Sequence, residues 1–141
     1  MDREILFRGR TIKTRFGGGK WIEGFFVMSC AGRAEMEPAI ITGTEKGCFM
    51  TEFVDPATVG QFTGLYDKNG KKIFEGDEVE TSCGEIGIIE YLEEDGMFII
   101  SFPITSGHSS WITTFRNLDG NEMEVIGNVH DNPELLKEES E

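Results

Sequence analysis

The side chains best suited to binding a metal ion lie between Asp67 and Glu78. Asp67, Asn69 and Glu78 occupy positions 1, 3 and 12 of the register in which an EF-hand loop binds Ca²⁺. Lys71 and Lys72, however, stand where that loop needs an oxygen ligand and a sharply bending glycine. The opening letters DKNG are instead typical of a tight turn, because Asn and Gly tolerate positive φ. The stretch therefore predicts a hairpin that joins two strands and holds no metal.

A second candidate, the run GGGK at residues 17–20, is similar to part of a phosphate-binding loop. That loop needs a Ser or Thr directly after its Lys, so that a hydroxyl can bind Mg²⁺ beside the phosphates. Trp21 stands at that position. We therefore expect residues 17–20 to be a flexible connection between two strands.

The histidines and cysteines are too scattered for a zinc site. His108 and His130 form no pair with each other or with a cysteine at zinc-ligand spacing. His108 has serine neighbours, but consecutive side chains of a strand point to opposite faces, and no acid or elbow motif orients them. An odd number of cysteines without a CxxC pair is typical of a reducing cytosol, and we expect buried, unreactive thiols. The serine neighbours of His108 are Ser106, Ser109 and Ser110, and the three cysteines are Cys30, Cys48 and Cys83.

Carboxylates are abundant, and Glu93, Glu94 and Asp95 form a run beside Gly96. Such a run next to a hairpin glycine is typical of a solvated loop rather than of a general acid and base. We therefore expect no enzyme, with no catalytic residue, no cofactor and no metal. The sequence identifies no residue as a partner-binding residue.

The chain of 141 residues is acidic, with 26 Asp or Glu against 13 Lys or Arg and a formal net charge of −13. Residues 1–20 carry a net charge of +4, and residues 21–141 carry −17. A negative surface repels phosphate backbones, so binding to duplex nucleic acid is disfavoured. The exception is a basic N-terminal segment that contains Arg3, Arg8, Arg10, Lys13, Arg15 and Lys20.

Hydropathy predicts a protein that does not enter a membrane. No stretch approaches the roughly 20 apolar residues of a membrane span, and the first residues lack the apolar core of a signal peptide. We therefore expect a soluble, cytoplasmic protein. Self-association remains open, because β-rich proteins with open sheet edges readily pair them.

Glycine content and short apolar runs predict an all-β fold. The 18 Gly are about twice the usual share of roughly 7% and favour turns over long helices. REILFRG at 3–9 alternates with the period of a half-buried strand. KWIEGFFVMSC at 20–30 predicts a second strand, in which Gly24 marks a bulge or a close approach of two backbones. Short strands continue through residues 60–130, at the spacing of a small barrel or sandwich.

Two short helical pieces interrupt this pattern. One helical turn is expected near 56–60, because Asp55 can cap it, Pro56 suits its first position and Gly60 can end it. A short C-terminal helix is expected from Pro133, followed by an acidic tail at 137–141.

The strand EVETS predicts one core residue with particular clarity. Val79 should point inward, and its neighbours Glu78 and Glu80 should point to the solvent. Most aromatic rings should also lie in the core, with a few left to form an exposed groove for a peptide or a protein partner. These aromatic residues are Trp21, Phe25, Phe26, Phe62, Tyr66, Phe74, Tyr91, Phe98, Phe102, Trp111 and Phe115.

Four pieces of the sequence, in order, resemble the YopX family of phage and prophage proteins. They are REILFRG, WIEG, VDPATVGQFTGLYDKNGKKIFEGDEVE and EVIGNVHDNPELL. The resemblance implies a phage or prophage origin, a bacterial host and no established activity. It also implies an SH3-like, partly open barrel in the C-terminal half. We therefore expect a single domain over 1–136, in which N-terminal strands 1–54 pack on a barrel-like part, 60–130.

Two hypotheses of function follow. The first is a non-enzymatic module that binds a host or phage protein through an acidic, partly aromatic surface, in its strongest form as a mimic of nucleic acid. The charge of −17 over residues 21–141 supports it. The alternative is a direct nucleic-acid binder or an unrecognised enzyme that uses the basic N-terminal segment.

Overall fold

A computed structural model describes residues 2–30, 32, 34–43, 46–103, 111–114 and 122–133, and these residues form an all-β protein. The predicted all-β class is therefore confirmed. In the described ranges no helix is long and apolar enough to cross a membrane. The strands are β1 (Phe7–Arg10), β2 (Trp21–Ser29), β3 (Glu37–Gly43), β4 (Phe49–Phe53), β5 (Gly60–Tyr66), β6 (Lys72–Phe74), β7 (Asp77–Glu80), β8 (Ile86–Leu92), β9 (Met97–Phe102), β10 (Trp111–Thr114) and β11 (Glu124–Asn128).

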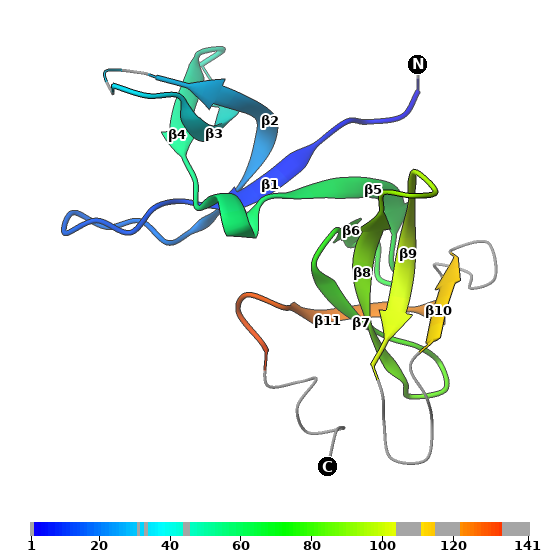
Figure 1. Ribbon diagram of the computed structural model, residues 1–141. Helices are drawn as coiled ribbons and strands as arrows, with labels where there is room; N and C mark the ends of the chain where they lie inside the picture. Colours follow the sequence, from blue (N-terminus) through cyan, green and yellow to red (C-terminus); the bar gives the residue numbers. More distant parts are fainter. Residues whose placement is uncertain are drawn as a thin grey trace. The chain divides into compact units, whose positions relative to one another are not determined.

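The chain divides into two compact units, Met1–Phe62 and Thr63–Glu141 (Figure 1). One sheet has the strand order β4-β3-β2-β1-β5-β6, and strand β5 runs from the first unit into the second. The other sheet has the order β10-β9-β8-β7-β11 and lies in the second unit. The predicted packing of strands 1–54 on 60–130 stays a prediction.

In the N-terminal unit, β1 to β4 form an antiparallel meander. Its core holds Ala39, Ile40 and Val54, which are buried. Past the ends of the strands, Thr11 pairs with Val54 in an isolated bridge, so the chain after β4 returns to the chain after β1. This return places the segment after β4 beside the loop that joins β1 to β2.

At Gly24 the backbone of β2 approaches the backbone of β3 closely. Gly24 pairs with Phe7 of β1, and the ladder to β3 begins at the next residue. A Cβ atom at Gly24 would collide with the carbonyl oxygen of Ile41, so only glycine fits. Of the two predicted reasons for this glycine, the close backbone approach is the one observed.

The predicted helical turn is a 3₁₀ turn, η1, over Pro56–Thr58. Asp55 caps it by accepting the backbone N–H of Ala57 at 3.0 Å. The buried hydroxyl of Thr58 donates to the carbonyl of Asp55 at 2.6 Å and accepts the N–H of Arg10 at 2.9 Å. The turn is therefore fixed to the end of β1.

The C-terminal unit has its core on the five-stranded sheet and β6. No strand pairing in the described ranges joins β10 to β11, so the sheet is open between them. The predicted C-terminal helix and acidic tail lie outside the described residues, apart from Pro133. The core residues are Ile73, Val79, Ile89, Ile100, Phe102, Met123 and Val125.

Strand β7 does not alternate as the sequence predicts. Val79 is fully buried, as predicted, and Glu80 is exposed, but Asp77 and Glu78 are also buried. The expectation that Glu78 points to the solvent is therefore wrong. Strand β7 is paired on both edges, with β8 and β11, and the burial of three consecutive residues shows that both of its faces are covered. Period-two alternation applies only where one face of a strand meets water.

Candidate functional site

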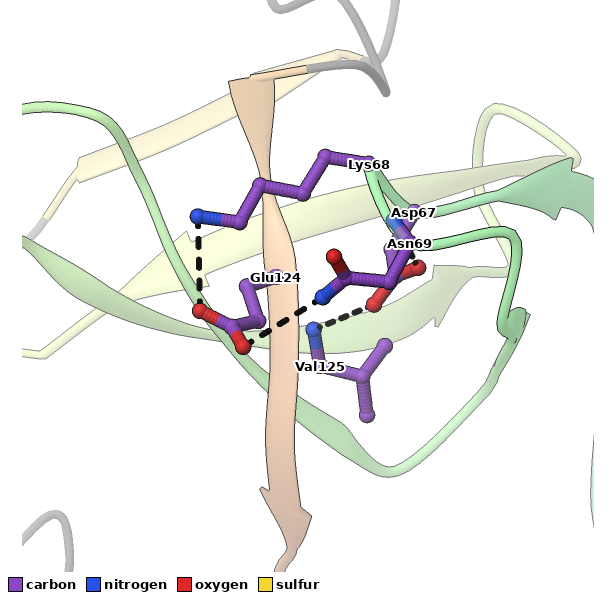
Figure 2. Close-up of polar contacts among 5 residues, drawn as sticks. All are labelled: Asp67, Lys68, Asn69, Glu124 and Val125. Atoms are coloured by element: carbon purple, nitrogen blue, oxygen red, sulfur yellow. Dashed lines mark hydrogen bonds and ion pairs between the residues drawn. The ribbon is translucent and has the colours of Figure 1, made fainter.

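The turn at residues 67–70 joins β5 to β6, as the sequence predicts, and its first residue is buried. Oδ1 of Asp67 accepts the N–H groups of Asn69 at 2.8 Å and of Lys71 at 2.9 Å. Oδ2 accepts the N–H of Val125 in β11 at 3.0 Å, as Figure 2 shows. Both carboxylate oxygens therefore face backbone donors, in the manner of a carboxylate that organises a turn.

Asn69 and Glu78, the other two residues of the Ca²⁺ register, also take part in contacts within the fold rather than in a shared site. The side-chain amide of Asn69 donates to Oε1 of Glu124 at 3.3 Å, and the ammonium of Lys68 lies 3.4 Å from Oε2 of the same residue (Figure 2). Glu78 is buried in β7. In the described part of the chain, no three His, Cys, Asp or Glu side chains gather as metal ligands. The residues of this register are therefore not assembled into a metal site.

The hydrogen bonds that Asp67 accepts also lower the pKa of its carboxyl group. Burial alone would raise the pKa of this carboxyl, because it disfavours the charged form. The N–H groups of Val125, Lys71 and Asn69, together with the Lys71 ammonium, stabilise the carboxylate more strongly. The net result is a pKa below the ordinary value of 3.8. Asp67 is thus held ionised as a structural anchor between the turn and β11.

The basic N-terminal segment forms a hairpin, and we call residues 7–22 the basic hairpin. The glycines of the GGGK run close its loop as a strand connection, with Gly18 and Gly19 at φ 110° and 76°. Figure 1 shows this loop projecting from β1 and β2. No Asp or Glu occurs between Glu4 and Glu23, whereas five cations do: Arg8, Arg10, Lys13, Arg15 and Lys20.

Guanidinium groups lie over two of the three aromatic rings of the basic hairpin, Trp21 and Phe16. Arg8 and Arg10 share one face of β1, and Trp21 lies directly opposite Arg10. The Cζ atoms of Arg8 and Arg10 lie 5.0 and 5.7 Å, respectively, from the centroid of the Trp21 ring. In the loop, Cζ of Arg15 stands 4.8 Å from the centroid of Phe16, a ring that is 86% exposed. Each contact has the geometry of a cation–π interaction.

A cleft of about 420 Å³ lies at the base of the basic hairpin. Backbone hydrogen bonds join its two walls, the chain after β1 and the chain after β4. The N–H of Asp55 donates to the carbonyl of Arg10 at 2.9 Å, and the N–H of Ile12 donates to the carbonyl of Phe53 at 3.3 Å. The cleft thus combines two cations, a hydroxyl and a carboxylate. It is lined by Arg10, Thr11, Ile12, Lys13, Asp55 and Pro56.

The remaining sequence candidates do not converge on this cleft. His130 lies in the turn after β11, where its N–H donates to Oδ1 of Asn128 at 3.0 Å. Glu93, Glu94 and Asp95 are exposed in the turn between β8 and β9, as expected for a solvated loop. His108 with Ser106, Ser109 and Ser110 lies outside the described residues.

Two expectations about burial are wrong. The thiols of Cys30, Cys48 and Cys83 are exposed, because each follows the end of a strand or lies in a loop. Most aromatic rings were expected in the core, yet among those described only Phe62, Phe74 and Phe102 are buried. The exposed ones are Phe25, Phe26, Tyr66 and Tyr91, and Phe16 and Phe49 are exposed as well. Phe115 and the side chain of Trp111 lie outside the described residues.

Comparison with known proteins places the chain among its relatives. A family model described as YopX protein matches residues 26–137. The chain belongs to the YopX family. The crystal structure of protein EF1440 from Enterococcus faecalis is similar to it, with a TM-score of 0.55 and 24% sequence identity over 96% of this chain and 99% of that one. That likeness concerns the fold alone. No curated protein matches the chain.

The YopX match covers the two candidate features unequally. The Asp67 turn lies inside residues 26–137, whereas the basic hairpin at 7–22 precedes them. The pieces REILFRG and WIEG therefore stand outside the matched range, although they support the same resemblance.

Proposed function

We propose that this YopX protein is a non-enzymatic accessory protein of a phage or prophage that acts in the cytoplasm of its bacterial host. It binds a host or phage protein through the acidic surface of its C-terminal unit, at a basic site that otherwise holds nucleic acid. The observation that carries this proposal is the division of charge between the two units.

The whole net charge of the chain belongs to the C-terminal unit. Residues 1–62 contain eight Asp or Glu and eight Lys or Arg, which cancel. Residues 63–141 contain 18 Asp or Glu against 5 Lys or Arg, a net of −13. A field of one sign concentrated on one unit attracts a basic partner and speeds its association.

The turn between β8 and β9 gives this acidic surface a place for direct contact, and we call residues 90–97 the acidic turn. The carboxylates of Glu90, Glu93, Glu94 and Asp95 are exposed there. Tyr91 and Met97 are also partly exposed, at 44% and 39%. Tyr91 is held by an edge contact with Phe98, at 5.1 Å between ring centroids. An ordered ring rimmed by charges suits a protein interface, where aromatic residues and Met are enriched.

The fold of the C-terminal unit supports the same proposal. We assign its open five-stranded sheet, with β6, to an SH3-like, partly open barrel. The antiparallel order β10-β9-β8-β7-β11 and the core around Val79, Ile89 and Ile100 support this assignment. Small barrels of this kind present loops and sheet edges to peptides and proteins, with no need for a reaction centre.

The proposal is tested by affinity capture from host cells that carry the prophage, at low and at high salt. We expect a basic nucleic-acid-binding protein to be retained at low salt and released as salt rises, because exposed charges are screened. The variant Glu93→Lys/Glu94→Lys should lose it, whereas the control Arg3→Glu/Lys46→Glu, at exposed sites in the N-terminal unit, should retain it. Capture that is insensitive to salt and to both charge reversals would refute the proposal.

A further inference from the structure

The basic hairpin carries charge that the proposed protein interface does not use. Lys13, Arg15 and Lys20 are exposed, and within the described ranges none of them forms an ion pair. Nearby, Arg8 lies directly opposite Glu23 in the β1–β2 ladder, so the positive charge is strongest toward the loop. The hairpin loop is therefore a cationic projection on a unit whose net charge is zero.

The rings of the hairpin suit a flat ligand. Phe16 is almost fully exposed at the loop, with one guanidinium over it, and Trp21 has two guanidiniums beside it. Unstacked bases of single strands stack on aromatic rings and on guanidinium planes. Because the Phe16 ring is 86% exposed, a flat ligand can reach it from the solvent.

The cleft between the hairpin and η1 has room for one nucleotide. Its volume of about 420 Å³ lies within the range of small-molecule sites. Arg10 and Lys13 can hold a phosphate at its edge. Asp55 repels phosphate but accepts amino protons, as carboxylates do from the exocyclic amine of cytosine. A base inside the cleft can therefore place its phosphate near the two cations and its amino group near Asp55.

We infer that the basic hairpin and its cleft form a binding site for single-stranded nucleic acid. The phosphates contact Lys13, Arg15 and Lys20, and one base stacks on Phe16. A duplex fits this site poorly, because its bases are already stacked and its dense charge meets the net negative charge of the chain. An anionic membrane surface could use the loop but would leave the polar cleft unfilled.

The test is fluorescence anisotropy of a labelled single-stranded oligonucleotide of mixed sequence, titrated with the whole protein at several salt concentrations. We expect binding that weakens as salt rises. Lys13→Glu/Arg15→Glu should lower the magnitude of the log–log salt slope by about 1.4, since each phosphate contact on a single strand contributes roughly 0.7. Phe16→Ala should weaken binding by a factor on the order of 10.

The matched control is Arg3→Glu/Lys46→Glu, which makes the same change of charge at exposed sites outside the hairpin. It should bind with the slope of the parent protein. Circular dichroism of each variant verifies that the strands are intact. The inference is overturned if the parent protein does not bind the oligonucleotide, if the hairpin variants bind like the control, or if duplex binds more tightly than single strand. Preferential binding to vesicles of anionic phospholipid would overturn it in favour of a membrane surface.

Discussion

Oδ2 of Asp67 accepts the backbone N–H of Val125 at 3.0 Å, across a sequence separation of 58 residues. The same carboxylate caps its own turn through Asn69 and Lys71. The backbone N–H of Lys68 adds a bond to the carbonyl of Met123 at 2.9 Å. One buried side chain therefore ties the β5–β6 hairpin to β11.

Replacing Asp67 with Ala should destabilise the C-terminal unit by about 3 kcal/mol. The change leaves buried N–H groups without their acceptor, and hydrogen bonds to charged groups are among the stronger ones. Urea unfolding followed by far-UV circular dichroism measures the effect. Asp95→Ala, in the exposed acidic turn, should change stability by less than about 0.5 kcal/mol. Equal unfolding midpoints for the two variants would show that Asp67 is no anchor.

The lowered pKa of Asp67 predicts acid sensitivity. Because the folded-state pKa lies below the ordinary value of 3.8, the ionised carboxylate stabilises the fold fully above that value. This stabilisation is lost as the pH falls from about 3.8 through the folded-state pKa. The difference in unfolding free energy between the parent protein and Asp67→Asn should therefore be constant near neutral pH and shrink in acid. A difference that stays constant throughout acid would be inconsistent with a lowered pKa.

Val79→Asp should prevent folding of the C-terminal unit. Val79 is fully buried in the core, and an unpaired carboxylate there costs more than about 4 kcal/mol. A thermal melt is the measurement, and Ser82→Asp, which adds the same group at an exposed site, is the control. A melting temperature close to that of the control would place Val79 outside the core.

Gly24→Ala should destabilise the N-terminal unit by about 2 to 4 kcal/mol, because the new methyl group collides with the backbone of β3. Gly43→Ala, at the end of β3, is the matched control, since a Cβ atom added at Gly43 would meet no atom within 4 Å. Hydrogen exchange of the β2 and β3 amides would localise the effect. Unchanged protection of those amides in Gly24→Ala would contradict the close approach.

Local chemistry made much of the fold predictable. The DKNG turn, the turn capped by Asp55 and the inward position of Val79 depend on a few neighbouring residues, and all three are observed. The burial of Glu78 was not predictable, because it depends on both faces of β7 being covered in the folded unit. The exposure of Phe25 in β2 likewise depends on which strand faces remain uncovered, and periodicity does not encode that.

The candidate sites were predictable only in part. The acid-free run between Glu4 and Glu23 is visible in the sequence and marks the basic hairpin. Its cleft was not, because Asp55 reaches Arg10 only through the return of the chain after β4. The division of charge between units also required their boundary at Phe62, which no linker composition reveals.

The central claim, that the acidic C-terminal unit occupies a nucleic-acid site on a basic partner, is tested most directly by competition. The captured partner is bound to labelled DNA, and the YopX protein is added while DNA release is measured. We predict release by the parent protein and by Lys13→Glu/Arg15→Glu, but not by Glu93→Lys/Glu94→Lys. A stable complex in which the partner holds DNA and the YopX protein together would contradict the claim.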